Sequence, residues 1–337
     1  MFILVQNRQE KHIMWTATDF AEGEFARGRR PPPPQTGKMS HRKLSALIRG
    51  GYGQGHFQRY KPWLRVTKRD YSPFSIIGHL PAPELGRLHH FRAIAEARTI
   101  QLAKWLGASD VREQYPMWPW EHAHPGEGLP GFDKGVRVRG LVDIAREAGI
   151  SHGLYVGTNI PYVGTLDILT SWKKENGEFF LLAIDNKPEE IATAPILGSR
   201  AKDRLELARR YVVECRVRHL LIHAEKFPPE LTYNLDALEP RMNAAARKIA
   251  IVTSLYKEIV QDLGEHAHVT PPLPLLRRIA SRRSTDLSRV QELYRLALWR
   301  LDIDHDLTLV LDNSEPLQKG GVVVWRELRK AWLKENA

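Results

Sequence analysis

The stretch that decides the fold is GTLDILTSWKKENGEFFLLAIDNKP, Gly164 to Pro188. Two apolar, β-prone runs flank a polar segment that ends in glycine, which is the pattern of a β-hairpin. If the hairpin is symmetric about Asn176, Asp167 lies directly across from Asp185. Cross-strand neighbours have Cβ atoms about 4.5–5.5 Å apart. The pattern therefore predicts two carboxylates side by side.

Lys187 joins this pair, because side chains alternate along a strand and place it on the face of Asp185. Opposed carboxylates repel one another and burial adds a desolvation cost, so a compensating positive charge is expected. Mg²⁺ commonly takes one or two carboxylate ligands, and a divalent-metal site is one interpretation. The other is that Lys187 neutralises a structural Asp pair. A third carboxylate, Glu96, lies in the middle of a predicted helix, where a Glu is usually exposed.

Composition limits the class of protein. The chain has 337 residues, 42% of them hydrophobic, enough for a sizeable core in two or three domains. The formal net charge of +11 favours a polyanionic partner such as nucleic acid, or else a well-solvated basic surface. One cysteine, Cys215, excludes an intramolecular disulfide and a thiolate metal cluster. We expect a cytosolic protein, since no stretch approaches the roughly 18 apolar residues of a membrane span.

The pattern along the chain predicts three domains. Residues 1–40 carry four consecutive prolines and a basic run, typical of an extended arm. Residues 41–239 are expected to form an α/β domain. Beyond Pro240, successive helical patterns are followed by two short strands in LTLVLDNSEPLQKGGVVVWREL and a last helix. Helices closed by a hairpin suggest a small winged-helix-like domain over 240–337.

Within the middle domain, apolar spacing from Pro83 to Gly107 predicts one helix that ends at the glycine. The following VREQYPMWPW is expected to be a strand, and EHAHPGEGLPGFDKG a mobile loop. A basic amphipathic helix and a buried strand, His219 to His223, come next. The histidines of the two EHAH segments are interpreted as exposed loop residues rather than zinc ligands, because no cysteine lies nearby.

A family resemblance connects these features. A helix Glu, a strand Asp and D-x-K on the partner strand form the pattern of the PD-(D/E)xK nucleases. The segments GYGQGHFQRYKPWLRV, GRLHHFRAIAE, VREQYP, GTLDIL and ARRYVVECRV occur in that order between residues 51 and 241. Together they resemble TnsA, the family of endonuclease subunits of two-subunit cut-and-paste transposases. This resemblance implies a restriction-endonuclease-like core, with a mixed sheet flanked by helices, and a mostly helical, winged-helix-like C-terminal domain.

The resemblance also implies the roles of individual residues. Glu96, Asp167 and Asp185 are expected to bind one or two Mg²⁺ ions, for which Mn²⁺ substitutes. Lys187 is the motif lysine, and the backbone carbonyl of Asn186 is a further expected ligand. Gln114 is expected to support the site. The candidates for DNA binding are the basic residues Arg59, Lys61, Arg204, Arg209 and Arg210.

The implied reaction is hydrolysis of phosphodiester bonds at the 5′ ends of a transposon in double-stranded DNA. In such a system a DDE transposase subunit cuts and joins the 3′ ends, and an AAA+ ATPase regulator contacts the C-terminal region. Two alternatives stay open. One is a free-standing nuclease of restriction or repair type; the other is a non-catalytic DNA-binding or bridging subunit whose hairpin charges are structural. No membrane partner is expected.

Overall fold

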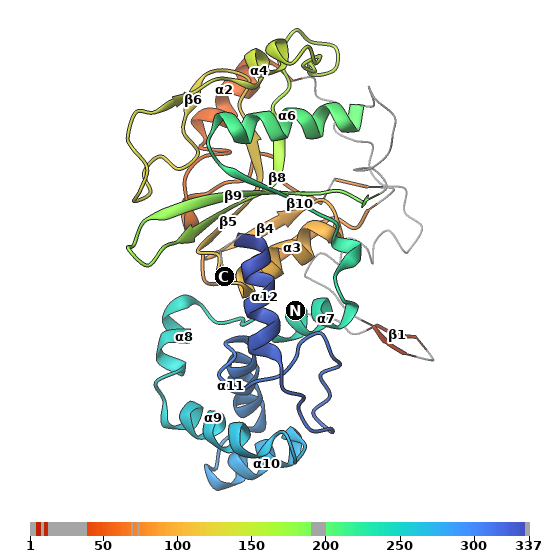
Figure 1. The fold of residues 1–337 in the computed structure, drawn as a ribbon, viewed down its shortest axis with the longest axis vertical. Helices are drawn as coiled ribbons and strands as arrows, with labels where there is room; N and C mark the ends of the chain where they lie inside the picture. The colour runs from red at the N-terminus through yellow and green to blue at the C-terminus, as the bar shows by residue number, and fades with distance from the viewer. Residues whose placement is uncertain are drawn as a thin grey trace. The chain divides into compact units, whose positions relative to one another are not determined.

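The computed structural model describes residues 5–7, 10–12, 39–68, 70–72, 75–189 and 200–333. The chain divides into two compact units (Figure 1). The first comprises residues 1–81, 88–100 and 107–225, and the second comprises 82–87, 101–106 and 226–337. Most of the predicted arm over 1–40 lies outside the described residues, apart from the paired strands β1 (Val5–Asn7) and β2 (Glu10–His12).

A mixed four-stranded sheet forms the centre of the first unit, in the order β10-β9-β8-β5. Strand β5 (Asp110–Met117) runs antiparallel to β8 (Gly164–Lys173), and β8 runs antiparallel to β9 (Phe179–Asn186). Strand β10 (Arg218–Ile222) pairs with β9 in parallel. The predicted α/β fold with a mixed sheet is confirmed, and it is consistent with a restriction-endonuclease-like core.

The β8–β9 hairpin has the predicted register. Ile168 pairs with Ile184 and Lys173 with Phe179, so the two strands are symmetric about Asn176. The turn is closed by Asn176, whose Oδ1 accepts a hydrogen bond from the Glu178 N–H at 3.1 Å. Local turn chemistry therefore sets which residues of the two strands lie opposite one another.

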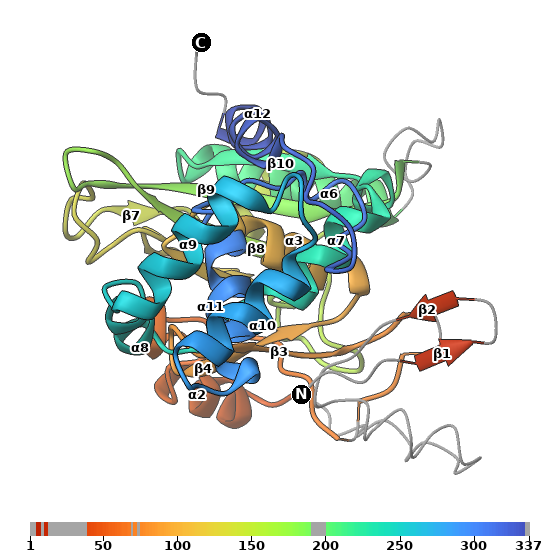
Figure 2. The same ribbon diagram turned by 90° about the horizontal axis from the view of Figure 1, so that it is seen from below.

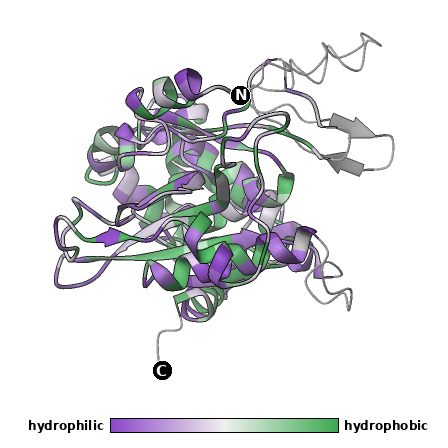
Figure 3. Ribbon diagram, turned by 90° about the horizontal axis from the view of Figure 1, so that it is seen from above, coloured by the Kyte–Doolittle hydropathy of each residue, from purple (hydrophilic) through white to green (hydrophobic). Residues whose placement is uncertain are grey.

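Helices pack on both sides of this sheet, with α6 (Arg200–Glu214) and the start of α3 (Ile94–Trp105) on opposite sides in Figure 1. Helix α6 lies between the parallel strands β9 and β10 in sequence, and its Leu207 and Tyr211 belong to the hydrophobic core that it shares with the sheet. Helix α4 (Leu141–Glu147) contacts α6. Figure 3 shows the hydrophobic residues concentrated along the strands and the inward sides of the helices. Such burial is the main favourable term in folding.

The prediction of one helix from Pro83 to Gly107 is wrong for the first half of this segment. Strands β3 (Gly78–Ala82) and β4 (Arg87–Phe91) pair there, and only α3 is helical. Gly86 adopts φ +63° in the turn between the strands, a conformation that glycine adopts without steric cost. The apolar spacing of this segment fits a helix, but the turn interrupts it.

The expected mobile loop at residues 121–135 is also corrected. It begins with β6 (His122–Ala123), which pairs with β7 (Arg137–Val138). The His122 Nε2 lies 2.7 Å from the Tyr211 hydroxyl, and the His124 Nε2 lies 2.7 Å from the Cys215 carbonyl oxygen. These histidines are therefore half-buried anchors to α6 rather than exposed loop residues.

Ahead of the sheet, α2 (His41–Arg49) begins at Ser40, whose hydroxyl accepts a hydrogen bond from the Lys43 N–H at 3.2 Å. Its Leu44 packs with Trp63 and Trp118. Short 3₁₀ turns occur at Phe57–Arg59 and Ala224–Lys226. None of the described helices is long and apolar enough to cross a membrane.

The second unit is helical (Figure 2). Helix α9 (Ser254–His266) begins after Thr253, whose hydroxyl accepts a hydrogen bond from the Tyr256 N–H and caps the helix. Leu263, Leu276 and Leu293 are fully buried between the helices. The helices are α7 (Pro229–Leu238), α8 (Ala244–Ala250), α9 (Ser254–His266), α10 (Pro272–Arg282), α11 (Leu287–Trp299) and α12 (Gly321–Leu333).

The two strands expected between Leu307 and Trp325 do not form in the described part of this unit. Instead, the GVVVW run begins α12. The carboxylate of Asp304 accepts hydrogen bonds from the Gly320 and Val322 N–H groups, both at 3.1 Å, and thereby caps the start of the helix. A cap from a residue distant in sequence overrides the β-propensity of the valines. The hairpin on which the winged-helix interpretation rested is therefore absent from residues 226–333.

Candidate active site

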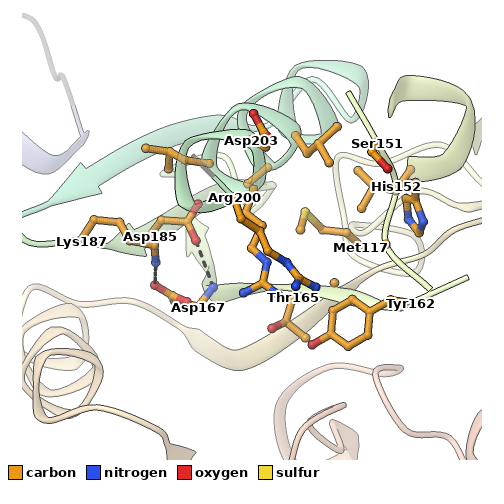
Figure 4. A pocket seen from close by; sticks show the side chains of 17 residues that line it. Met117, Ser151, His152, Tyr162, Thr165, Asp167, Asp185, Lys187, Arg200 and Asp203 are labelled. Carbon is orange, nitrogen blue, oxygen red and sulfur yellow. Dashed lines mark hydrogen bonds and ion pairs between the residues drawn. The ribbon is translucent and has the colours of Figure 1, made fainter. Parts of the chain in front are cut away.

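The two hairpin aspartates meet at the end of the β8–β9 ladder (Figure 4). The Asp167 N–H donates to Asp185 Oδ1 at 3.2 Å, and the Asn186 N–H donates to Asp167 Oδ2 at 2.7 Å. Asp185 is only 3% exposed. The local register thus brings both carboxylates to one point, as the sequence predicts.

Lys187 completes the charged trio. Its Nζ donates to Asp167 Oδ2 at 3.0 Å and to the Asn186 carbonyl oxygen at 2.9 Å. Both acceptors belong to the expected metal-ligand set, so the ammonium group occupies positions that a cation would share. The side chain of Lys187 is 29% exposed.

Glu96 lies in the first turn of α3 rather than in the middle of a helix. Its Oε2 accepts hydrogen bonds from the Arg92 N–H at 2.9 Å and from Gln114 Nε2 at 3.0 Å. Gln114 in turn accepts from the Thr165 hydroxyl at 3.3 Å. With φ at +50°, Gln114 adopts the left-handed conformation that is uncommon for a non-glycine residue and clusters at functional sites.

Burial and like charge disturb the titration of these groups. Burial, followed by the charge of Asp167, raises the pKa of Glu96 to about 8. Burial and then the charge of Asp185 raise the pKa of Asp167. Burial lowers the pKa of Lys187, but Asp167 and Asp185 outweigh it and the net shift is upward. Lys187 therefore does not fully offset the burial and mutual repulsion of Glu96 and Asp167.

A second layer of side chains, which the sequence did not reveal, fixes the D-N-K segment. Nε2 of His219 donates to Asp185 Oδ2 at 2.8 Å, and the Thr99 hydroxyl donates to Asn186 Oδ1 at 2.6 Å. The His223 Nδ1 lies 2.7 Å from the Lys187 carbonyl oxygen. His219 is the second residue of β10, and His223 directly follows that strand. Their role depends on the parallel pairing of β10 with β9, which the sequence alone did not indicate.

The donor set suits a hard cation by its chemistry. Glu96, Asp167 and Asp185 offer carboxylate oxygens, the ligands that Mg²⁺ prefers, and a divalent charge would offset the like charge that contributes to the raised pKa values of Glu96 and Asp167. Among the described residues, however, no three His, Cys, Asp or Glu side chains are arranged closely enough to hold a metal ion. With Lys187 bonded to Asp167, these residues therefore supply the ligand chemistry of a cation site but not its arrangement.

A cavity of about 500 Å³ opens beside the aspartates (Figure 4). Carboxylates and Lys187 line one end, and the loop around His152 lines the other. The remaining walls come from α6 and the buried side chains beneath it. Lining residues include Met117, Leu141, Ser151, His152, Tyr162, Thr165, Asp167, Asp185, Lys187, Arg200, Asp203, Arg204 and Leu207.

Comparison with known proteins finds a similar transposition protein. No protein-family model matches the chain. It is 26% identical over 231 residues to the Tn7 transposition protein TnsA of Escherichia coli, and the match covers 67% of this chain and 73% of that protein. The chain is similar to TnsA. This similarity agrees with the resemblance that the sequence motifs indicate.

The five residues predicted to bind DNA lie in different parts of the first unit. Arg204 lines the cavity beside the aspartates. Arg209 and Arg210 both bond to Glu206, with distances of 2.7–2.8 Å. The remaining pair is exposed near α2, where Lys61 Nζ donates to the Gly50 carbonyl oxygen at 2.8 Å and Arg59 lies close by in sequence. Of these residues, only Arg204 is brought next to the candidate active site by a shared cavity.

Proposed function

We propose that the chain is the DNA-endonuclease subunit of a two-subunit transposase and hydrolyses phosphodiester bonds at the 5′ ends of a transposon. The observation that carries this proposal is the hydrogen-bonded group of Asp167, Asp185 and Lys187 at the end of the hairpin, with Glu96 near enough for the charge of Asp167 to raise its pKa. Perturbed titration beside a cavity is typical of a functional site. The similarity to TnsA supports the transposition context.

The proposed cofactor is one or two Mg²⁺ ions, with Mn²⁺ as a substitute. Glu96, Asp167, Asp185 and the carbonyl oxygen of Asn186 would hold it. When bound, the ion supplies positive charge at the scissile phosphate and makes water a stronger acid. When Glu96, Asp167 and Asp185 are all ionised, their negative charge exceeds the charge of Lys187, and a divalent ion would balance the excess.

The side chains of the protein would position the reacting groups. Lys187, released from Asp167, has its ammonium group available for a phosphate oxygen and offsets charge that develops there. Gln114 keeps the Glu96 carboxylate oriented toward the site through its 3.0 Å hydrogen bond. His219 does the same for Asp185 at 2.8 Å. Together these contacts pre-organise the acidic site before DNA arrives.

The proposed partners follow from the same family. Double-stranded DNA at the transposon ends is the substrate, a DDE transposase subunit carries out the 3′ reactions, and an AAA+ ATPase regulator contacts the helical C-terminal region. Basic side chains of the first unit would contact phosphates, which position a protein on DNA without reading sequence.

Calorimetry of Mn²⁺ binding, with and without duplex DNA, tests the proposal. Wild-type protein should bind Mn²⁺, and Asp167→Ala should lose that binding while retaining its circular-dichroism spectrum. Asp143→Ala is the control, because Asp143 is an exposed carboxylate on α4 that pairs with Arg146. Absence of binding in the wild type, even with DNA present, would favour the non-catalytic bridging subunit. Metal-dependent cutting of DNA without any transposase would favour a free-standing nuclease.

A further inference from the structure

The cavity beside the aspartates extends well beyond the charged trio. From Asp167 and Asp185 it runs along the start of α6 to Ser151 and His152. Its floor is apolar, formed by buried side chains such as Met117 and Leu141. A volume of about 500 Å³ lies within the range of pockets that hold small organic ligands, about 300–1,000 Å³. One nucleotide unit of a DNA strand is a ligand of that size.

Two arginines line this cavity. Arg200 and Arg204 are one turn apart on α6, both are exposed, and Figure 4 shows the Arg200 side chain reaching toward Thr165. Within the ranges that the structure describes, neither guanidinium has a hydrogen-bond or ion-pair partner. Further along the same helix, Arg209 is held by Glu206.

The contrast between these arginines indicates what Arg200 and Arg204 would bind. An arginine paired with a carboxylate has its charge and its donors satisfied, whereas an unpaired guanidinium presents a fork of N–H groups that matches a phosphate. Asp203 is the only acid that α6 contributes to the described lining, so the side opposite the aspartates carries net positive charge. A DNA phosphate placed there lies within the same cavity as the candidate active site.

We propose that Arg200 and Arg204 bind the phosphate next to the scissile phosphate, and that the cavity holds the nucleotide that joins these two phosphates. This inference rests on the proposed endonuclease function and adds a positioning role. A flanking phosphate held by α6 fixes how the strand enters and therefore which bond is presented to Asp167 and Asp185. Such a contact positions the reacting bond without taking part in the chemistry.

A chemical scan of the substrate tests this role. The full-length chain, assembled with its transposase subunit on a transposon-end duplex, is compared across duplexes that carry one neutral methylphosphonate at successive positions around the cut. In the wild type, one flanking position should lower kcat/KM about tenfold, as expected for loss of a charge-assisted contact. The Arg200→Ala/Arg204→Ala variant should lose about as much on unmodified DNA, and the methylphosphonate at that position should then have no further effect.

Arg146→Ala is the matched control, because Arg146 is an exposed arginine on α4 that lies outside the cavity lining and pairs with Asp143. It should cleave like the wild type and keep the full sensitivity to the methylphosphonate. If the double variant responds to every methylphosphonate as the wild type does, the phosphate contact is overturned while the endonuclease proposal stands. If the wild type cleaves no duplex at all, both proposals fail together.

Discussion

Two groups of buried charges in this chain differ in how well they are matched. In the first unit, Glu96, Asp167 and Asp185 surround one lysine, and the pKa values of Glu96 and Asp167 are raised by burial and then by like charge. In the second unit, Lys104 bonds both Glu84 and Glu239, and Arg247 bonds Glu84 at 3.1 Å.

The second group is matched in charge. Burial alone would raise the pKa of Glu84, but Lys104, a backbone hydrogen bond and the charge of Arg247 together outweigh it, and the net shift is downward. Burial likewise lowers the pKa of Lys104, and Glu239 and Glu84 reverse that shift. In a matched group each buried charge has a partner of opposite sign, whereas the acidic group of the first unit keeps an excess of negative charge that the proposed cation would offset. The difference is what we expect between a structural charge cluster and a functional one.

The largest effect is expected from Asp167→Asn. Cleavage should fall by roughly a thousandfold, because the substitution removes a charged oxygen at the reacting centre. Without metal, the same variant should unfold at a higher temperature than the wild type, since it relieves repulsion with Asp185 and Glu96. Cleavage assays and thermal unfolding in chelator measure the two effects. A variant that is less stable than the wild type without metal would show that the acidic group is not under electrostatic strain.

Breaking the matched group should instead cost stability. Lys104→Met leaves Glu84 and Glu239 buried without their shared cation, and the free energy of unfolding should drop by about 3–5 kcal/mol. Urea unfolding measures the change. Lys173→Met is the control, because Lys173 is exposed at the end of β8. A loss no larger than that of the control would remove the distinction between the two groups.

His219 tests how far the acidic group is pre-organised. His219→Ala removes the 2.8 Å bond to Asp185 and should weaken Mn²⁺ binding by about 10–100-fold. His219→Gln, which retains an N–H donor, should recover part of the affinity. Calorimetry provides the metal affinity, and kcat and KM measured separately show whether the loss is in metal loading or in DNA binding. Equal losses in both variants would mean that His219 contributes packing alone.

The smallest effect is expected from Asp236, an unmatched acid in the second unit. Burial raises the pKa of Asp236 to about 6, and Gln101 Nε2 donates to its Oδ1 at 2.8 Å. Because the folded pKa lies above the unfolded value, ionisation costs stability above pH 6, and the cost disappears as the pH falls toward 4. Asp236→Asn keeps the acceptor and should stabilise the protein at pH 8 by on the order of 1 kcal/mol. Urea unfolding at pH 8 and pH 5 should show a smaller gain at the lower pH; an equal gain would exclude ionisation as the cause.

Several features of the fold could be read from local sequence. The β8–β9 register follows from the turn at Asn176, and the long helix α6 follows from hydrophobic patterning, whereas the mixed sheet was expected from the family resemblance. Two segments could not be read in this way. The turn at Gly86 divides an apparently helical stretch, and the valines before Trp325 have strand propensity yet lie in a helix. In both segments a short-range pattern was ambiguous.

For the candidate site, the sequence by itself determined the chemistry: the acidic residues, the lysine and their family-like order. Only the tertiary structure decided what surrounds them. It brought His219 within hydrogen-bond distance of Asp185 and gave Gln114 its left-handed backbone conformation. It also paired Arg209 with Glu206 and left Arg204 without a partner among the described residues. Periodicity and turn chemistry act between residues close in sequence, and a sequence shows them directly. Hydrogen bonds and charge pairing depend on distances between residues far apart along the chain, and these distances exist only after folding.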